Sequence, residues 1–209
     1  MTRKNHEDNT SPPARNANLS AQAVILAAEA IDGSEIAFNQ LVDLFQGDVF
    51  KMVYYRTLSR MDAEDITQNV FIKAFKNISG LKSPERFKSW LFSIALNQTR
   101  DFYRKKKLLT MLGISGRNEE YEPDSEKGDT PDPLDDMIRR DFWKHVGLFL
   151  DKLPGMEREV FTLRFMDHLA IQEIGDVLGK RESTVKTHLY RALEKFRKET
   201  KMRQFLTGE

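Results

Sequence analysis

The sequence predicts an all-α protein made of two small helical domains joined by an acidic, flexible linker. Apolar residues recur at helical spacing from Ser34 onward and again after Asp135. No segment has the apolar–polar alternation that marks a half-buried strand. Between the two helical parts, Glu119 to Asp136 holds nine acidic residues against Lys127 alone. That composition favours an extended connector over a packed core.

The chain begins with a polar, proline-containing stretch over residues 1–18, which we expect to be a disordered tail. The first domain covers 19–107, and its first helix runs from Ser20 to Ile31 and ends near Gly33. A second helix, from Ser34 to about Arg56, places one apolar stripe toward the core: Phe38, Leu41, Val42, Phe45, Val49, Met52 and Val53.

The third helix is predicted to begin near Asp62, which suits an N-cap position. Its buried face is expected to hold Ala63, Ile66, Val70, Phe71, Ala74, Phe75 and Ile78. A loop containing Gly80 and Pro84 follows, and a fourth helix extends from about Glu85 to Lys106. These four helices complete the first domain.

The linker covers 108–134 and the second domain covers 135–209. The second domain opens with an apolar helical face that ends at Pro154-Gly155 and consists of Phe142, Val146, Phe149, Leu150 and Leu153. Val160, Phe161 and Leu163 mark the next helix. The last two helices flank Gly179, and Gly175 would let them pack closely, which predicts a helix-turn-helix. Ala170 lacks the capping side chain expected there, at a cost of about 1 kcal/mol.

Composition excludes several classes of site. The chain has 0 cysteines, and its 4 histidines show no ligand spacing, so we expect no metal and no cofactor. No glycine-rich phosphate loop, paired metal carboxylates or nucleophile with its base is present, so we expect no enzymatic activity and no small-molecule substrate. Without an apolar run of spanning length or a signal-peptide pattern, a cytoplasmic location is expected.

The formal net charge of +1 conceals two basic regions. Residues 100–107 hold five bases and one acid, and 180–203 hold nine bases and three acids. The last helix carries an apolar stripe of Val185, Leu189, Ala192 and Phe196. Its other side presents Ser183, Thr187, Tyr190 and Arg191, with Lys186 on the flank. Short hydroxyl and basic side chains of this kind suit a DNA major groove. A basic helix with one solvated face is the alternative.

The fourth helix carries a second polar edge, formed by Trp90, Asn97, Asp101 and Arg104. An aromatic wall, base-edge donors and acceptors, and nearby cations such as Arg100 are typical of surfaces that bind unstacked bases. Two alternatives stay open: Trp90 in the core, and Asp101 as a partner for Arg104 within the helix. The sequence thus indicates one reader of opened nucleic acid and one reader of duplex DNA.

Four ordered blocks resemble the conserved regions of bacterial extracytoplasmic-function (ECF) sigma factors, group 4 of the primary sigma family. They are "AFNQLVDLFQGDVFKMVYY", "DAEDITQNVFIKAF", "FKSWLFSIALNQTRDFYRKKK" and "LPGMEREVFTLRFMDHLAIQEIGDVLGKRESTVKTHLYRALEKFRK". The resemblance covers roughly 34–107 and 141–198. It implies an alternative sigma factor that binds core RNA polymerase, directs it to promoters and promotes strand opening.

The resemblance also implies roles for single residues. Contacts to the beta-prime clamp helices of core polymerase fall on Asp62, Asp65, Gln68 and Phe71; a plain helix-capping role for the two aspartates is compatible with this. Contacts to the −10 element fall on Trp90, Asn97, Arg100, Asp101 and Arg104, with Asn97 at a pocket for a flipped base and 79–86 as the base-selecting loop. Contacts to the −35 element fall on Arg164, Ser183, Lys186, Thr187, His188, Tyr190 and Arg191.

Further partners follow from the resemblance alone. They are the polymerase beta subunit, promoter DNA and an anti-sigma factor, often membrane-anchored, that separates or clamps the two domains. The protein would then be cytoplasmic, associated with the nucleoid when bound to polymerase and held at the inner membrane when inhibited. The acidic linker would thread polymerase channels or serve as a solvated spacer. The rival function is a helix-turn-helix regulator that acts on duplex DNA without replacing sigma.

Overall fold

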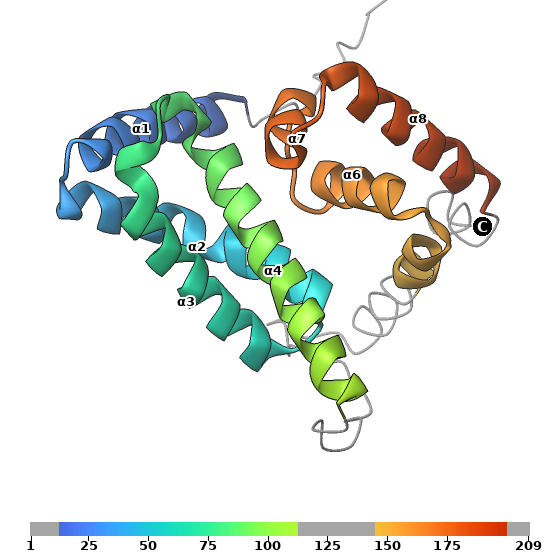
Figure 1. Ribbon diagram of the computed structural model, residues 1–209. Coiled ribbons are helices and arrows are strands. Elements are labelled where there is room, and N and C mark those ends of the chain that lie inside the picture. The colour runs from blue at the N-terminus through green and yellow to red at the C-terminus, as the bar shows by residue number, and fades with distance from the viewer. Residues whose placement is uncertain (1–12, 113–144, 200–209) are drawn as a thin grey trace, which may run out of the picture.

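The computed structural model describes residues 13–112 and 145–199, and every regular element within these ranges is helical (Figure 1). The N-terminal domain contains α1 (Pro13–Ile31), α2 (Glu35–Thr57), α3 (Arg60–Asn77) and α4 (Phe87–Met111), with the 3-10 turns η1 (Ile78–Gly80) and η2 (Pro84–Arg86) before α4. The C-terminal domain contains a helical segment over 145–152, then α6 (Gly155–Phe165), α7 (Ile171–Leu178) and α8 (Glu182–Lys198). The predicted all-α fold with two helical domains is confirmed.

Serine side chains start the two central helices. The Ser34 hydroxyl accepts a hydrogen bond from the Ala37 N–H at 3.2 Å, and the Ser59 hydroxyl accepts one from the Asp62 N–H at 3.3 Å. The prediction that Asp62 caps α3 is therefore wrong, because the capping residue is Ser59 and the helix begins at Arg60. Asp62 lies in the first turn instead, where its charge still favours the positive end of the helix.

Two helices are longer than the sequence indicated. Helix α1 begins at Pro13, inside the predicted tail, since the fixed φ of proline suits a first helical position. Helix α4 runs to Met111, beyond the predicted end at Lys106 and into the predicted linker. The rest of the predicted tail and linker lies outside the described residues.

The N-terminal core is built on α2, α3 and α4, whose apolar stripes face one another as the spacing predicts. Leu41, Val53 and Leu91 are each fully buried. Phe75 is the exception on α3: it is 47% exposed, so its predicted burial is wrong. Its ring meets the Phe38 ring edge-on at 5.1 Å between centroids.

The hydrophobic core continues from one domain into the other. Leu163, Leu169 and Ile174 of the C-terminal domain belong to the same buried cluster as the α2–α4 core. Helix α7 packs against both α4 and α8 and lies between them (Figure 1). A second cluster of Phe149, Leu153, Phe161 and Ala192 ties α6, α8 and the 145–152 segment together. Within the described residues, no helix has the length and apolarity needed to cross a bilayer.

Candidate nucleic-acid interface

A tight turn joins α7 to α8. Gly179 ends α7 in the left-handed region at φ 62°, and the Lys180 N–H donates to the Gly175 carbonyl at 2.8 Å. A Cβ at Gly175 would lie 2.8 Å from the Lys180 carbonyl oxygen, closer than backbone allows. Gly175 was predicted to let the two helices pack closely, but the atoms that a Cβ there would meet belong to the turn at Lys180 and not to the second helix.

The start of α7 is capped in an unusual way. Ala170 has no side-chain acceptor, as the sequence indicated, but its N–H donates to the Glu173 carboxylate at 2.7 Å. This is the reciprocal half of a capping box, and it satisfies a backbone donor just before the helix. The cost expected from the missing cap is thus partly offset by Glu173.

Helix α8 presents its predicted contact residues to solvent. Val185 and Ala192 are buried, while Ser183, Lys186, Thr187, Tyr190 and Arg191 are exposed on the other side. Tyr190 is 69% exposed, which no packing requirement explains. Lys186 forms an ion pair with Glu182 at 3.3 Å within the helix. The face of α8 predicted to meet the major groove is open.

Two other predicted duplex-contacting residues are placed differently. Arg164 is exposed, but its Nη1 donates to the Leu169 carbonyl at 2.9 Å and so holds the loop before α7. His188 is half-buried, and its buried Nδ1 has no hydrogen-bond partner among the described residues. Neither side chain belongs to the open row on α8.

The polar edge of α4 is only partly open. Asn97 and Arg104 are exposed, and Arg104 pairs with Asp101 one turn away, the alternative weighed for Asp101. Trp90 is half-buried, packs against the core and lies 5.9 Å from the Phe87 ring, between the two roles considered for it. Arg100 Nη2 lies 3.3 Å from Glu159 Oε2, so the Arg100 guanidinium already forms an ion pair with a side chain of the C-terminal domain.

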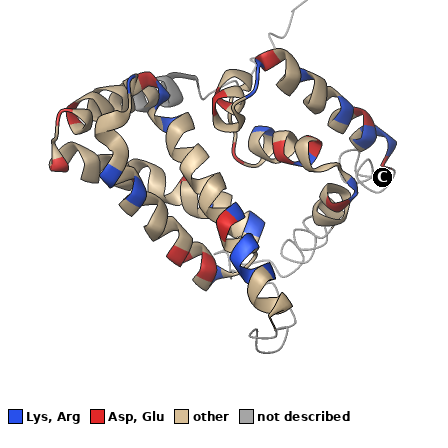
Figure 2. Ribbon diagram, viewed as in Figure 1, with Lys and Arg blue, Asp and Glu red and all other residues tan. Residues whose placement is uncertain are grey.

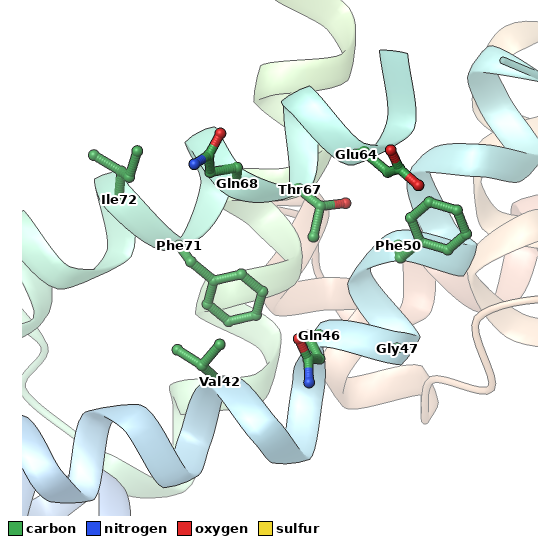
Figure 3. A pocket seen from close by; sticks show the side chains of 9 residues that line it. All are labelled: Val42, Gln46, Gly47, Phe50, Glu64, Thr67, Gln68, Phe71 and Ile72. Carbon is green, nitrogen blue, oxygen red and sulfur yellow. The ribbon is translucent and has the colours of Figure 1, made fainter. Parts of the chain in front are cut away.

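An apolar groove runs between α2 and α3 (Figure 3). Phe71, Val42 and Phe50 line it, together with the polar side chains of Gln46, Glu64, Thr67 and Gln68. Thr67 contributes a buried hydroxyl oxygen that has no hydrogen-bond partner among the described residues. Two predicted polymerase-contact residues, Gln68 and Phe71, meet here, whereas Asp62 and Asp65 are not among its lining residues.

Charged side chains join the domains, and apart from Arg100 they were not among the predicted site residues. Arg56 at the end of α2 lies 2.8 Å from Asp167 and 3.1 Å from Glu159 (nitrogen to oxygen). With Arg100, these residues form a four-residue clasp. The side chain of Asp167 is 2% exposed and that of Arg56 is 12% exposed. No local pattern could have revealed the clasp, because its ion pairs join residues 59 to 111 positions apart.

The clasp has an electrostatic cost as well as a gain. Burial acts to lower the pKa of the Arg56 guanidinium, but Asp167 and Glu159 outweigh it and hold that pKa above its ordinary value. Burial raises the pKa of the Asp167 carboxyl, and the Arg56 guanidinium opposes this shift. Removing either partner alone would leave the other charge buried and unpaired.

Comparison with known proteins matches both halves of the chain. Residues 41–108 match the family model for Sigma-70 region 2, and residues 146–196 match the model for Sigma-70, region 4. The ECF RNA polymerase sigma factor SigW of Bacillus subtilis (strain 168) is 31% identical over 169 residues, which span 80% of this chain and 90% of SigW. The chain belongs to the ECF sigma factor family. It is accordingly an alternative sigma factor, a transcription-initiation protein that binds core RNA polymerase and promoter DNA.

Other relatives of this sigma factor agree. The ECF RNA polymerase sigma-E factor of Escherichia coli (strain K12) is 26% identical over 174 residues, covering 81% of this chain and 90% of the relative. Among solved structures, that of CnrH in complex with the cytosolic domain of CnrY superposes with a TM-score of 0.60 and 27% identity, covering 83% of this chain and 94% of that chain. In this sigma factor, region 2 thus comprises most of α2, α3 and most of α4, and region 4 comprises the 145–152 segment through α8.

Proposed function

We propose that this sigma factor binds promoters with two separate surfaces, region 4 on −35 duplex DNA and region 2 on the opened −10 strand. The observation that carries the proposal is the presence, on one chain, of two polar helix faces with different chemistry. Helix α8 offers hydroxyl and basic side chains, and α4 offers an indole, an amide and cations. The first set suits the edges of paired bases, and the second suits unstacked bases.

In region 4, the N-terminal half of α8 enters the major groove. Arg191 reads base edges, because its fork matches the two acceptors of guanine. Lys186 contacts phosphate, since its single ammonium cannot make the same bidentate pair. Ser183, Thr187 and Tyr190 lie along the same open row and allow close approach to the DNA. Arg164 acts from the side by supporting the loop before α7.

In region 2, the exposed amide of Asn97 lines a pocket for a base flipped out of the −10 element. Unstacking a base costs a few kcal/mol, and a shaped pocket returns that cost only for the correct base. Trp90 supplies an apolar wall beside it, and Arg100 and Arg104 contact the strand backbone. Residues 79–86, which include η2, select among bases at a second position.

The groove between α2 and α3 binds the clamp helices of the beta-prime subunit. An apolar floor and a rim of amides suit an amphipathic helix, and the unpaired Thr67 hydroxyl can take a polar partner there. Gln68 and Phe71 make this contact within the groove, and Asp62 and Asp65 extend it along α3. The beta subunit contacts other parts of the chain.

An anti-sigma factor keeps the free protein inactive. The likeness to CnrH, which was solved with the cytosolic domain of CnrY, supports a protein partner for this chain. A membrane-anchored partner of this kind would hold the sigma factor at the inner membrane until a signal releases it, after which the protein would join polymerase at the nucleoid.

The rival function, a helix-turn-helix regulator without polymerase, explains α8 but neither the α4 edge nor the α2–α3 groove. A gel-shift assay on promoter duplex separates the two. We expect weak, salt-sensitive binding by the chain alone and tight, sequence-specific binding once core polymerase is added. Tight and specific binding by the chain alone, unchanged by core polymerase, would favour the regulator.

A further inference from the structure

The end of α4 exposes a dense group of apolar side chains. Four of the last five positions through the C-cap are exposed, with exposed fractions of 44% to 76%: Leu108, Leu109, Met111 and Leu112. Elsewhere in residues 13–112 and 145–199, no stretch of five positions holds more than two exposed large hydrophobic residues. At about 100° per residue, the four cover an arc of roughly 160° on the helix surface. We call them the apolar tip of α4.

A run of cations lies directly before the apolar tip. Residues 104–107 are Arg-Lys-Lys-Lys, and all four are exposed. Arg104 pairs with Asp101, whereas Lys105 and Lys107 form no ion pair with any residue that the structure describes. Figure 2 shows the basic run as a blue band on α4, and Figure 1 shows the end of this helix extending past α3. Positive charge and apolar surface are thus presented side by side.

Neither nucleic acid nor a second copy of the chain accounts for both features. Phosphates attract the basic run, but the apolar tip gains little beside a highly charged backbone. A second copy would bring two basic runs together, and like charges at short distance repel. The tip is also small beside the roughly 800 Å² per partner that a stable protein interface buries. The occupant must offer anionic groups and aliphatic surface together.

An anionic phospholipid surface offers both. Its headgroups carry negative charge, and the acyl boundary beneath them takes aliphatic side chains. From Lys106 to Met111 the helix rises about 8 Å at 1.5 Å per residue. That distance falls within the roughly 5–10 Å to which apolar residues of peripheral helices enter the interface. The basic run therefore stays at the headgroups while the apolar tip reaches the acyl boundary.

We propose that the end of α4 docks the free protein on anionic membrane surfaces, with the apolar tip inserted and residues 104–107 at the headgroups. A polybasic run strengthens the hold of a small apolar insertion, which alone binds only weakly and reversibly. This inference goes beyond the proposed function, in which the promoter and polymerase contacts leave the apolar tip without a role. The affinity belongs to the chain itself and needs no protein partner.

Vesicle flotation with the whole chain tests the apolar tip. Leu108→Ser with Leu112→Ser removes half of it, and Ile25→Ser with Ile36→Ser is the matched control. Both isoleucines are exposed, and neither has Lys or Arg within four positions. On vesicles of equal phosphatidylglycerol and phosphatidylcholine, the tip variant should bind at least about tenfold more weakly than the parent, because two leucine side chains no longer leave water. The control variant should bind like the parent.

The basic run is tested in the same assay. Lys105→Gln with Lys107→Gln removes two charges, and Lys106 is kept because its ammonium lies 5.7 Å from the centre of the Phe102 ring. Binding to the mixed vesicles should fall about tenfold or more, since each cation near an anionic surface contributes several-fold. The parent should also bind pure phosphatidylcholine vesicles about tenfold more weakly than the mixed ones. Equal binding to the two kinds of vesicle would overturn the choice of an anionic surface.

A dye at the apolar tip reports insertion directly. Because the chain has 0 cysteines, Met111→Cys and Ile25→Cys each provide a single labelling site, and both positions are exposed. An NBD dye at position 111 should brighten and shift to the blue on the mixed vesicles, as it leaves water for the acyl boundary. The same dye at position 25 should not change. A bound chain whose dye at position 111 stays in water would overturn the proposal.

Two further measurements separate a membrane from the other occupants of this surface. Circular dichroism should show equal helix content in the parent and all variants, and association with core polymerase should be unchanged in the tip variant. A tip variant that keeps its vesicle affinity would reduce the attraction to charge alone and overturn the proposal. A tip variant that loses affinity for core enzyme but not for vesicles would also overturn it, since the apolar tip would then be a polymerase contact.

Discussion

The Arg56 guanidinium donates from Nη2 to the Asp167 carboxylate at 2.8 Å and so connects two residues 111 positions apart in sequence. One partner ends α2 of region 2, and the other lies in the loop after α6 of region 4. Both side chains are almost completely buried. This contact joins the two domains through two identified side chains, so substitutions at these positions can test how the domains are held together.

Removing one member of the pair should cost more than removing both. Arg56→Ala leaves the Asp167 carboxylate buried without its cation, which should lower the free energy of unfolding by roughly 3 kcal/mol. Combining Arg56→Met with Asp167→Leu removes both charges and should recover most of that loss. Urea denaturation followed by circular dichroism measures both. A single variant as stable as the parent would show that the clasp does not form in solution.

The turn of the helix-turn-helix should not accept a methyl group at Gly175. Gly175→Ala forces the Lys180 carbonyl to move, so we expect a loss of about 1–3 kcal/mol and weaker duplex binding. Gly147→Ala, in the helical 145–152 segment, is the control, because nothing lies within 4 Å of a Cβ there. It should be neutral or stabilising by up to about 1 kcal/mol. The melting temperature should therefore fall for Gly175→Ala and stay equal or rise for Gly147→Ala, relative to the parent. Equal melting temperatures for the two variants would refute the steric argument.

Asn97→Ala should impair strand opening without affecting association with core polymerase. The Asn97 side chain is exposed and lies outside the α2–α3 groove, so association with core polymerase should be unchanged. Open-complex formation, followed by permanganate reactivity of unpaired thymines, should fall because the flipped base loses its partner. If Asn97→Ala opens promoters as fast as the parent, another residue of α4 holds the base.

Arg191→Ala and Lys186→Ala should weaken −35 binding in different ways. If Arg191 reads a base edge, its loss should cost about 1–3 kcal/mol on the preferred sequence and relax specificity at one position. Loss of Lys186, a phosphate contact, should weaken binding about equally on all sequences and reduce its salt dependence. Competition binding of holoenzyme across a promoter library measures both. The same dependence of binding on DNA sequence and salt for the two variants would mean that Arg191 also contacts only the DNA phosphates.

Polymerase binding should depend on the exposed edge of α3. Asp65→Ala combined with Gln68→Ala should weaken association with core enzyme, while duplex contacts by α8 stay intact. Gln22→Ala with Glu29→Ala on α1 removes the same chemical groups from exposed positions outside the groove. Fluorescence anisotropy of the labelled sigma factor, titrated with core enzyme, measures the affinity of each double variant. Equal loss in both double variants would point to a general effect on the fold.

Much of the fold follows from local pattern in the sequence. The apolar stripe of α2 predicts most of the residues that are buried, because a helix that faces one core must repeat every three to four residues. Val42 is the exception, since it is only half-buried and lines the groove. Helix boundaries were less predictable, since Ser59 and Asp62 are both good caps and only packing chooses between them. The half-exposed Phe75 shows the same limit at the edge of a stripe.

Some features of the site could likewise be predicted from the sequence, and others could not. The open row on α8 could be predicted, because amphipathic spacing sets which side faces away from the core. The ion pair of Arg100 with Glu159 and that of Arg56 with Asp167 could not be predicted, because both depend on how the two domains pack against each other. The buried Nδ1 of His188 likewise depends on neighbours that no spacing reveals.

Run-off transcription with purified core polymerase, with and without this chain, across a library of promoter sequences tests the central claim most directly. The account predicts transcripts that start at a defined distance from a shared −35 and −10 pattern, only when the chain is present. A folded chain, free of any inhibitor, that yields no start site with core enzyme would contradict the account.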